Sequence, residues 1–430
     1  MKLNKILSSN FAKSVAFITG GTVIAQILGA LFSPIITRIY TPEEYGILTV
    51  YTAVLGLIAV VGTLKYEMAI PICKDDEKAV NVMTLSFIVL IIFSLSVTLL
   101  LFFWGEFFLS LLDAKILFDY KYLIPFGVFF IGSYNIFMQW AFRKKNFKAI
   151  ARTKLSQSIV GNGTKIGLGL LGIGPIGLLL GQILKDGAGI TALSRPFVKE
   201  DKHLLKNIHK DDIIHNAKRY KNFPIFYAPD QLLNVAGLQL PVFFLTSLYG
   251  NQIVGLYGLA NGIVNLPMSL IGNSIGDVFY GEVASIGRTN PYRIKELSLK
   301  LFKRLVIFGL IPLLALLFFG PFLFSFVFGS EWYEAGVYAR ILSFVVFARL
   351  IFTPISRVFT VYERQKTQLF LDLFRVILIS LSFVIARFFS LNSYLYLILN
   401  SSSVILQYFI GFLLAQRILN QEIKKNEMEK

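Results

Sequence analysis

Three ionisable side chains lie deep within apolar stretches of the N-terminal half of the 430-residue sequence: Lys165, Lys185 and Asp186. Charged groups are costly to place in apolar sequence, so they mark a binding site, a pathway or an ion pair. The two stretches run in opposite directions from a GIGPIG turn around Pro175, so we expect these groups at similar depth. Asp186 can neutralise only one lysine, which leaves the other as a candidate ligand for an anion such as phosphate. A Lys-Asp pair beside a second, snorkelling lysine would explain the same residues.

The C-terminal half offers a second set of polar groups. Arg349 is its best candidate cation, because no acidic residue lies within one helical turn of it. Arg375 is a weaker candidate, since Asp372 precedes it by three residues and can pair with it on a helix. Spacings of four, eight and four residues place a polar stripe on one face of a helix, formed by Asn261, Asn265, Asn273 and Asp277. This stripe is expected to face a cavity or a neighbouring helix; hydrogen bonding between helices alone is an alternative explanation.

Further charged residues lie in or beside apolar stretches. Three acidic residues could each take up and release a proton or a sodium ion, namely Asp186, Asp230 and Asp277. Arg38, Lys65 and Glu67 end apolar stretches, where we interpret them as gate or anchor residues. The pair Lys65 and Glu67 is expected to snorkel to the interface.

Two patterns in the sequence resemble binding motifs, one for a dinucleotide and one for a metal ion, but neither predicts a binding site. Gly167, Gly169 and Gly172 form G-x-G-x-x-G inside an apolar stretch with no strand before it, which excludes a dinucleotide-binding turn. Histidines recur every six residues in a basic segment at positions 203, 209 and 215, which predicts a solvated surface helix in preference to a metal site. We therefore expect no metal and no cofactor.

The composition excludes a soluble fold. The chain is 55% hydrophobic and only 16% charged, with a mean hydropathy of +0.66, whereas a soluble domain has about 25% charged residues. Its net charge of +17 comes mostly from Lys and Arg in short gaps between apolar runs, where basic residues set membrane topology and do not indicate nucleic acid. Cys73 is the only cysteine, so an internal disulfide is excluded.

Windows of about 20 apolar residues predict an all-α integral membrane protein with about twelve transmembrane helices. The spans are placed at 14–37, 46–64, 79–103, 122–142, 155–173, 175–194, 223–248, 253–280, 301–328, 335–356, 368–388 and 394–416. Lys and Arg concentrate in alternate loops, which predicts that both termini are cytoplasmic. The long basic insert divides the spans into an N-lobe (1–194), a cytoplasmic linker (195–222), a C-lobe (223–416) and a cytoplasmic tail (417–430).

Two turns share a pattern at about half-chain separation. Thr37, Tyr40 and Gly46 in ITRIYTPEEYGIL recur as Thr246, Tyr249 and Gly255 in LTSLYGNQIVGLY. These turns join spans one to two and seven to eight, so we interpret the halves as parallel repeats of six helices. Three small-xxx-small glycine pairs, 163 with 167, 258 with 262 and 272 with 276, are expected to let helices approach closely.

The stretch from Leu238 to Glu282 resembles the polysaccharide flippases of the multidrug/oligosaccharidyl-lipid/polysaccharide (MOP) exporter superfamily, which move O-antigen and capsule repeat units. The resemblance rests on LPVFFLTSLYG, VGLYGLANGIVNLPMSLIG, GDVFYGEVAS and, in the first hairpin, TRIYTPEEYG. It implies two six-helix bundles forming a V around a central cavity that opens to each side in turn. It also implies a substrate, an oligosaccharide linked to undecaprenyl pyrophosphate, and action in the bacterial cytoplasmic membrane. The expected protein is monomeric, contacts membrane lipids, and works with a polysaccharide polymerase and glycosyltransferases.

Three other functions are weighed against flipping of such repeat units. Drug export is disfavoured because the first span offers only Gln26 and Thr19 at depth, where cation-coupled drug exporters of this superfamily often place an acid. Lipid II export is disfavoured because the first two spans lack internal arginines. A membrane enzyme of polysaccharide assembly needs a sizeable non-cytoplasmic loop, and the longest one here, about Trp104 to Lys121, is short and apolar. We therefore expect a transporter and not an enzyme.

Overall fold

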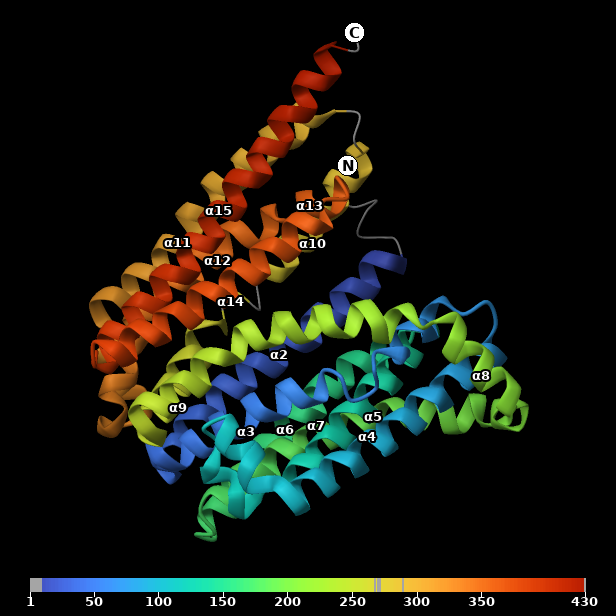
Figure 1. Cartoon of the computed structure of the whole chain (residues 1–430), viewed down its shortest axis with the longest axis horizontal. Helices are drawn as coiled ribbons and strands as arrows, with labels where there is room; N and C mark the ends of the chain where they lie inside the picture. Colours follow the sequence, from blue (N-terminus) through green and yellow to red (C-terminus); the bar gives the residue numbers. More distant parts are fainter. Residues whose placement is uncertain (1–9, 267, 269–271, 288–289, 429–430) are drawn as a thin grey trace. The chain divides into compact units, whose positions relative to one another are not determined.

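The structure is a computed structural model that describes the backbone of residues 10–266, 268, 272–287 and 290–428; the side chains of 10–19, 273, 274, 277 and 365 lie outside the description. Every regular element in these ranges is helical (Figure 1). Among them, nine helical stretches are long and apolar enough to cross a membrane. The predicted all-helical membrane fold is confirmed.

The chain divides into two compact units, Met1–Ser247 and Leu248–Lys430. The helices of the first unit are α2 (Asn10–Ile39), α3 (Pro42–Ala59), α4 (Asp76–Leu111), α5 (Leu123–Arg143), α6 (Phe147–Leu170), α7 (Pro175–Pro196), α8 (Lys210–Arg219) and the first part of α9 (Ala228–Val264). Short helical segments join them: η1 (Tyr66–Ile72), η2 (Lys115–Tyr120), η3 (Phe197–Asp201), η4 (Lys202–Asn207) and η5 (Phe223–Tyr227). In this unit α6 packs against both α7 and α2, and α5 packs against α7.

The second unit contains the end of α9 and the helices α10 (Asn273–Ile286), α11 (Pro291–Phe328), α12 (Tyr333–Ile355), α13 (Arg357–Val361), α14 (Gln365–Phe388) and α15 (Ser393–Met428), with η8 (Ser330–Trp332) between α11 and α12. Helix α12 packs against α11 and α15, and α15 also packs against α14. A buried cluster at the Pro291 end of α11 contains Phe279 of α10, Ile294 of α11 and Phe359 of α13.

Local sequence signals explain several helix boundaries. Helix α3 begins with a capping box in which Thr41 accepts a hydrogen bond from the amide of Glu44, and the Glu44 carboxylate accepts from the amide of Thr41. The GIGPIG turn holds Gly172 at φ +70° and Gly174 at φ +62°, a region that glycine adopts without strain. Pro175 then occupies the first turn of α7, where its missing amide proton is not needed.

The two matched turns have similar local structure. The hydroxyl of Tyr40 donates to the carbonyl of Lys165 at 2.8 Å, and that of Tyr249 donates to the carbonyl of Leu391 at 2.8 Å. Each therefore ties the end of its own helix to a backbone carbonyl more than 120 residues later in the chain. A non-helical residue inside α9, Gly250 at φ +80°, forms the turn predicted between the seventh and eighth spans.

Several predicted spans have boundaries that differ from those of the helices in the structure. Helix α4 continues to Leu111, beyond the predicted end at 103, because the apolar residues continue past a local break at Trp104. Within the predicted eighth span at 253–280, α9 ends at Val264 and α10 begins at Asn273, and Pro267 between them lies outside the described residues.

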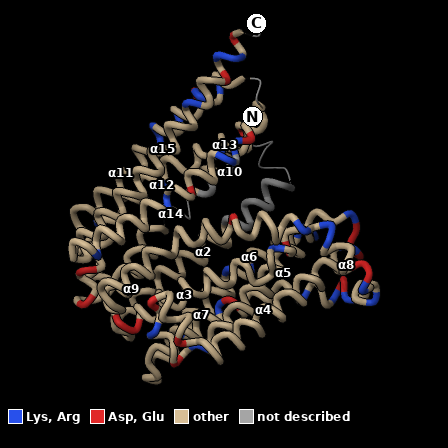
Figure 2. The backbone as a smooth tube through the Cα atoms, viewed as in Figure 1, with Lys and Arg blue, Asp and Glu red and all other residues tan. Residues whose placement is uncertain are grey.

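The basic linker at 195–222 forms the predicted surface helix, α8, and is also anchored to the first unit. The Asn81 side chain on α4 donates to the Asn207 carbonyl at 3.0 Å and accepts from the His209 amide at 3.1 Å. Around α8 and along the last turns of α15, Lys and Arg are dense, whereas the middles of the helices are almost free of charge (Figure 2).

A charged network holds the start of the linker on α4 and α5. The Lys144 ammonium lies 2.7 Å from Asp76 and 2.8 Å from Asp201, and the Trp140 indole donates to Asp201 at 3.0 Å. Burial lowers the pKa of Lys144, but its hydrogen bonds and charge attraction to Asp201 and Asp76 outweigh that effect and raise the pKa above its ordinary value of 10.5. This network therefore fixes the linker by ion pairs as well as by packing.

Candidate functional site

Lys165 lies on the face of α6 that packs against α7. Only 8% of the residue is exposed. A Cβ at Gly181 of α7 would overlap Cγ of Lys165 and lie 2.9 Å from the Gly161 carbonyl, so only glycine leaves room for the lysine stem. The hydroxyl of Tyr40, which directly follows α2, donates a hydrogen bond to the Lys165 carbonyl. This bond holds the end of α2 against the same turn of α6.

Lys185 of α7 makes the reciprocal contact on α6. A Cβ at Gly161 would lie 2.6 Å from Cβ of Lys185, so the two lysine stems each cover a glycine of the opposite helix. This arrangement places the two lysines one helical turn apart across the α6–α7 contact, as their positions around the GIGPIG turn predicted. The glycines that allow it are not the predicted pair: a Cβ at Gly163 or Gly167 would meet nothing within 4 Å.

Gln182 and Asp186 complete this group on α7. The Lys165 ammonium donates to Oε1 of Gln182 at 3.4 Å, a long hydrogen bond. Among the described residues, neither Lys165 nor Lys185 forms an ion pair with Asp186 within 4.0 Å, and Oδ2 of Asp186 is buried with no hydrogen-bond partner. The predicted Lys-Asp pair is therefore not formed in this structure.

The structure adds Lys154 to this group. Lys185, Lys165 and Lys154 all lie close enough to Asp186 to interact with its charge. The Nζ atom of Lys154 also lies over the Tyr134 ring, 5.3 Å from the ring centre. We name Lys154, Lys165, Lys185 and Asp186 the lysine cluster; it contains three lysines and one carboxyl group. The sequence prediction missed Lys154 because it immediately precedes the span predicted to begin at 155.

In the second unit, Arg349 of α12 contacts the predicted amide stripe of α9. Nη1 of Arg349 donates to Oδ1 of Asn265 at 3.2 Å, and Nδ2 of Asn265 donates to the Asn261 carbonyl and side-chain oxygen, each at 2.7 Å. We name Arg349, Asn265 and Asn261 the arginine-amide chain. The arginine-amide chain combines one cation with amide groups, a set that can bind phosphate and sugar hydroxyls. Its groups also hydrogen-bond to one another between helices, which is the alternative explanation of the polar stripe.

The other predicted residues have partners outside these two groups. Arg375 pairs with Asp372 at 3.4 Å, as its sequence spacing predicted. Lys65 lies 3.8 Å from Glu67, whose carboxylate also accepts from Thr63 at 2.5 Å. Glu67 is only 2% exposed, so its carboxylate is enclosed by protein, where Lys65 and Thr63 are its partners.

The remaining candidates are exposed or outside the description. Arg38 at the end of α2 and Asp230 near the start of α9 are exposed. Asn273 and Asp277 lie on the described backbone of α10, but their side chains are outside the described residues. The structure therefore places no contact on the second half of the predicted polar stripe.

A buried polar row on α15 was not predicted. Tyr396, Asn400 and Gln407 are each at most 7% exposed, and their side-chain oxygens have no hydrogen-bond partner in the part of the chain that the structure describes. On α12, which packs against α15, Nε of Arg340 is likewise buried and without a partner. The spacing of four and seven residues places the α15 row on one helical face, and this spacing is a signal that the sequence does contain.

Comparisons with known proteins identify the family and the fold. A family model described as polysaccharide biosynthesis protein matches residues 35–337. Among curated proteins, none matches this chain. Because the family model covers more than half of the sequence, it establishes family membership.

Solved transporters show the same fold at low sequence identity. An inward-facing multidrug resistance MATE family transporter of the MOP superfamily is 17% identical, with 95% of this chain and 99% of that chain covered and a TM-score of 0.75. An outward-facing one is 15% identical, with 97% and 98% covered and a TM-score of 0.63. The lipid II flippase MurJ in an inward closed conformation is 16% identical, with 96% and 90% covered and a TM-score of 0.67. The chain therefore belongs to the polysaccharide biosynthesis protein family and has the fold of the MOP superfamily of transporters.

Proposed function

We propose that this protein flips undecaprenyl-pyrophosphate-linked oligosaccharide repeat units across the cytoplasmic membrane of a bacterium, for the synthesis of O-antigen, capsule or exopolysaccharide. Family membership supports a role in polysaccharide biosynthesis, and the transporter fold supports movement of a substrate across the membrane. In this proposal the protein has no enzymatic activity, and the polymerase and glycosyltransferases of the pathway are its partners.

The lysine cluster is the observation that carries the proposal. The cluster has three lysines and one carboxyl group, and in the described structure no ion pair within 4.0 Å joins Lys165 or Lys185 to Asp186. Buried cations without counterions are unfavourable unless a ligand compensates them. A diphosphate provides that compensation, and it is the part of a lipid-linked sugar that every repeat unit shares. The arginine-amide chain then supplies a second cation with amides for the sugar.

The mechanism follows from the proposed architecture. We place twelve spans in two bundles of six, an N-lobe at 1–194 and a C-lobe at 223–416, which form a V around a central cavity. Structures of one fold in inward- and outward-facing conformations support alternating access for transporters of this type. Both termini and the linker at 195–222 are placed in the cytoplasm on the basis of their Lys and Arg residues.

Translocation in proteoliposomes tests the function directly. The purified chain is reconstituted with a fluorescent oligosaccharide on undecaprenyl pyrophosphate, and sugar exposed on the outer leaflet is oxidised with periodate. We expect about half of the sugar to be protected from a single treatment without the protein, and nearly all to become accessible with it. Recovery of the lipid-linked sugar at its original mass distinguishes flipping from polymerisation or ligation.

Two other substrates make the test specific. Lipid II and a cationic fluorescent drug are reconstituted in parallel, as substrates for the alternative transporters of this fold. Movement of the drug or of lipid II, with no movement of the repeat unit, would reject the proposed substrate while leaving a transport function. Imposed proton and sodium gradients then test Asp186, Asp230 and Asp277 as coupling residues.

A further inference from the structure

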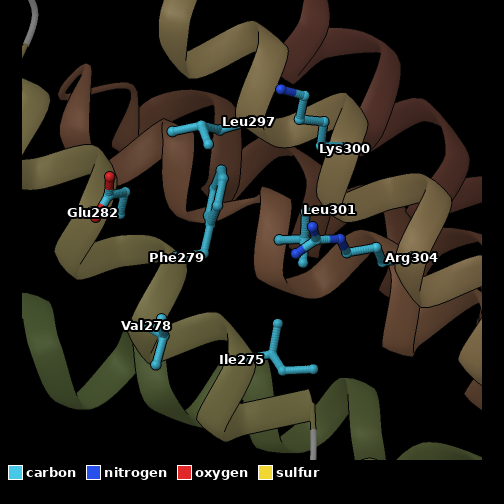
Figure 3. A pocket seen from close by; sticks show the side chains of 8 residues that line it. All are labelled: Ile275, Val278, Phe279, Glu282, Leu297, Lys300, Leu301 and Arg304. Carbon is cyan, nitrogen blue, oxygen red and sulfur yellow. The ribbon is translucent and has the colours of Figure 1, made fainter. Parts of the chain in front are cut away.

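A groove of about 480 Å³ lies between α10 and α11 in the second unit. Its lining is mostly apolar, with charged side chains from both helices: Ile275, Val278, Phe279, Glu282, Leu297, Lys300, Leu301 and Arg304. Figure 3 shows that Glu282 and Lys300 lie toward one end and Ile275 and Val278 toward the other. The groove is therefore amphipathic along its length.

The charged end carries both signs on opposite walls. Glu282 comes from α10, whereas Lys300 and Arg304 come from α11. Lys300 is paired with Glu296 at 2.5 Å. For Arg304, and for the carboxylate of Glu282, the described structure contains no ion pair within 4.0 Å, although they line the same groove. Each is thus available to a ligand of the opposite charge.

The apolar end continues onto a surface suited to lipid chains. Ile307, Phe308 and Ile311 follow Arg304 on the same face of α11 and are 66 to 69% exposed. Val278, on the α10 wall, is 74% exposed. In a membrane protein such a surface is covered favourably by acyl chains, and Lys and Arg beside it mark the headgroup level.

We propose that this groove binds a phospholipid with a zwitterionic amine headgroup, such as phosphatidylethanolamine. The phosphate lies against Arg304 and Lys300, the ammonium group lies against Glu282, and one acyl chain lies along Phe279 and Leu301 toward Ile275. Charge complementarity selects this occupant: an anionic lipid satisfies Arg304 but leaves Glu282 facing negative charge. The site is separate from the lysine cluster and the arginine-amide chain and is independent of the proposed substrate.

Native mass spectrometry of the full-length protein in detergent tests the site. The probes are phosphatidylethanolamine, phosphatidylglycerol and phosphatidylcholine with identical acyl chains. We expect phosphatidylethanolamine to bind best, and Arg304→Gln and Glu282→Gln each to weaken its binding roughly tenfold or more, the effect of losing one charged contact. The matched control is Lys303→Gln, because Lys303 is an exposed neighbour on α11 that does not line the groove; it should change binding by less than about twofold.

The lipid comparison gives results that would overturn the proposal. Equal binding of all three lipids, or equal loss in the control, means that no specific site exists. Preference for phosphatidylglycerol, together with insensitivity to Glu282→Gln, means that the groove binds an anionic lipid by its basic wall alone. Thermal unfolding of each variant is measured alongside, and we expect unchanged stability because both side chains are exposed. Loss of binding in a variant that has unfolded counts against the proposal. The exception is the case in which Lys303→Gln remains folded and Arg304→Lys restores binding.

Discussion

Replacing Lys165 with methionine separates substrate binding from structural support. In the described structure the Lys165 ammonium has one hydrogen bond, at 3.4 Å to Gln182, and no ion pair. Methionine fills similar space over Gly181 and removes a charge whose insertion into a membrane costs about 2.5 to 3.5 kcal/mol. We therefore expect Lys165→Met to be as abundant and as thermally stable as wild type, or more so.

Its effect on an anionic ligand is expected to be large. A hydrogen bond to a charged group contributes about 1.5 to 3 kcal/mol, so loss of one contact should weaken binding roughly 10- to 150-fold. The assay is binding of undecaprenyl diphosphate to protein in lipid nanodiscs, followed by translocation in proteoliposomes. Arg152→Gln is the matched control, because Arg152 is an exposed cation on the same helix.

Two results would refute the reasoning on Lys165. If Lys165→Met lowers abundance and unfolding temperature, the lysine supports Asp186 structurally despite the absence of an ion pair. If binding and translocation match wild type while Arg152→Gln also has no effect, the lysine cluster does not contact the substrate.

Three further predictions follow from other contacts. Arg349→Gln should insert normally but weaken undecaprenyl diphosphate binding about tenfold or more, measured in the same nanodisc assay; unchanged binding would assign Arg349 to holding Asn265 alone. Gly181→Ala should destabilise the first unit by about 1 to 3 kcal/mol through overpacking. Gly163→Ala should be neutral or stabilising, because a Cβ at this position meets no neighbour within 4 Å. Thermal unfolding in detergent distinguishes the two variants, and equal effects would contradict the packing of α6 against α7. Because the pKa of Lys144 is raised in the folded protein, its ion pairs should contribute their full stabilisation at neutral pH, and this stabilisation should be lost as the pH rises through that pKa, above 10.5. The difference in stability between wild type and Lys144→Gln should then vanish at high pH. A stability difference that does not change with pH would contradict the prediction.

The sequence signals that worked best were local ones. The turn at Gly250 was predicted from a short stretch with Gly and Asn between two apolar runs, because tight turns need particular residues at particular positions whatever packs around them. The pairing of Arg375 with Asp372 was predicted because residues three apart on a helix are neighbours.

Contacts between helices were harder to predict. Gly163 and Gly167 have the same spacing as a close-packing motif, but the structure uses Gly161 and Gly181 instead, because rotation of α6 about its axis decides which glycines meet α7. The packing of α6 against α7 also brings Lys154 near Asp186, and among the described residues it leaves no ion pair within 4.0 Å between Asp186 and Lys165 or Lys185.

The sequence by itself therefore determined that this protein lies in a membrane, that its fold is helical and which family it resembles. Long apolar runs separated by basic gaps are stable in a lipid bilayer only as membrane-spanning helices. Only the tertiary structure decided which buried charges face one another and which remain without a counterion. The physical reason is that hydropathy and helical spacing are properties of one helix, whereas the compensation of a buried charge depends on atoms supplied by the helices packed against it.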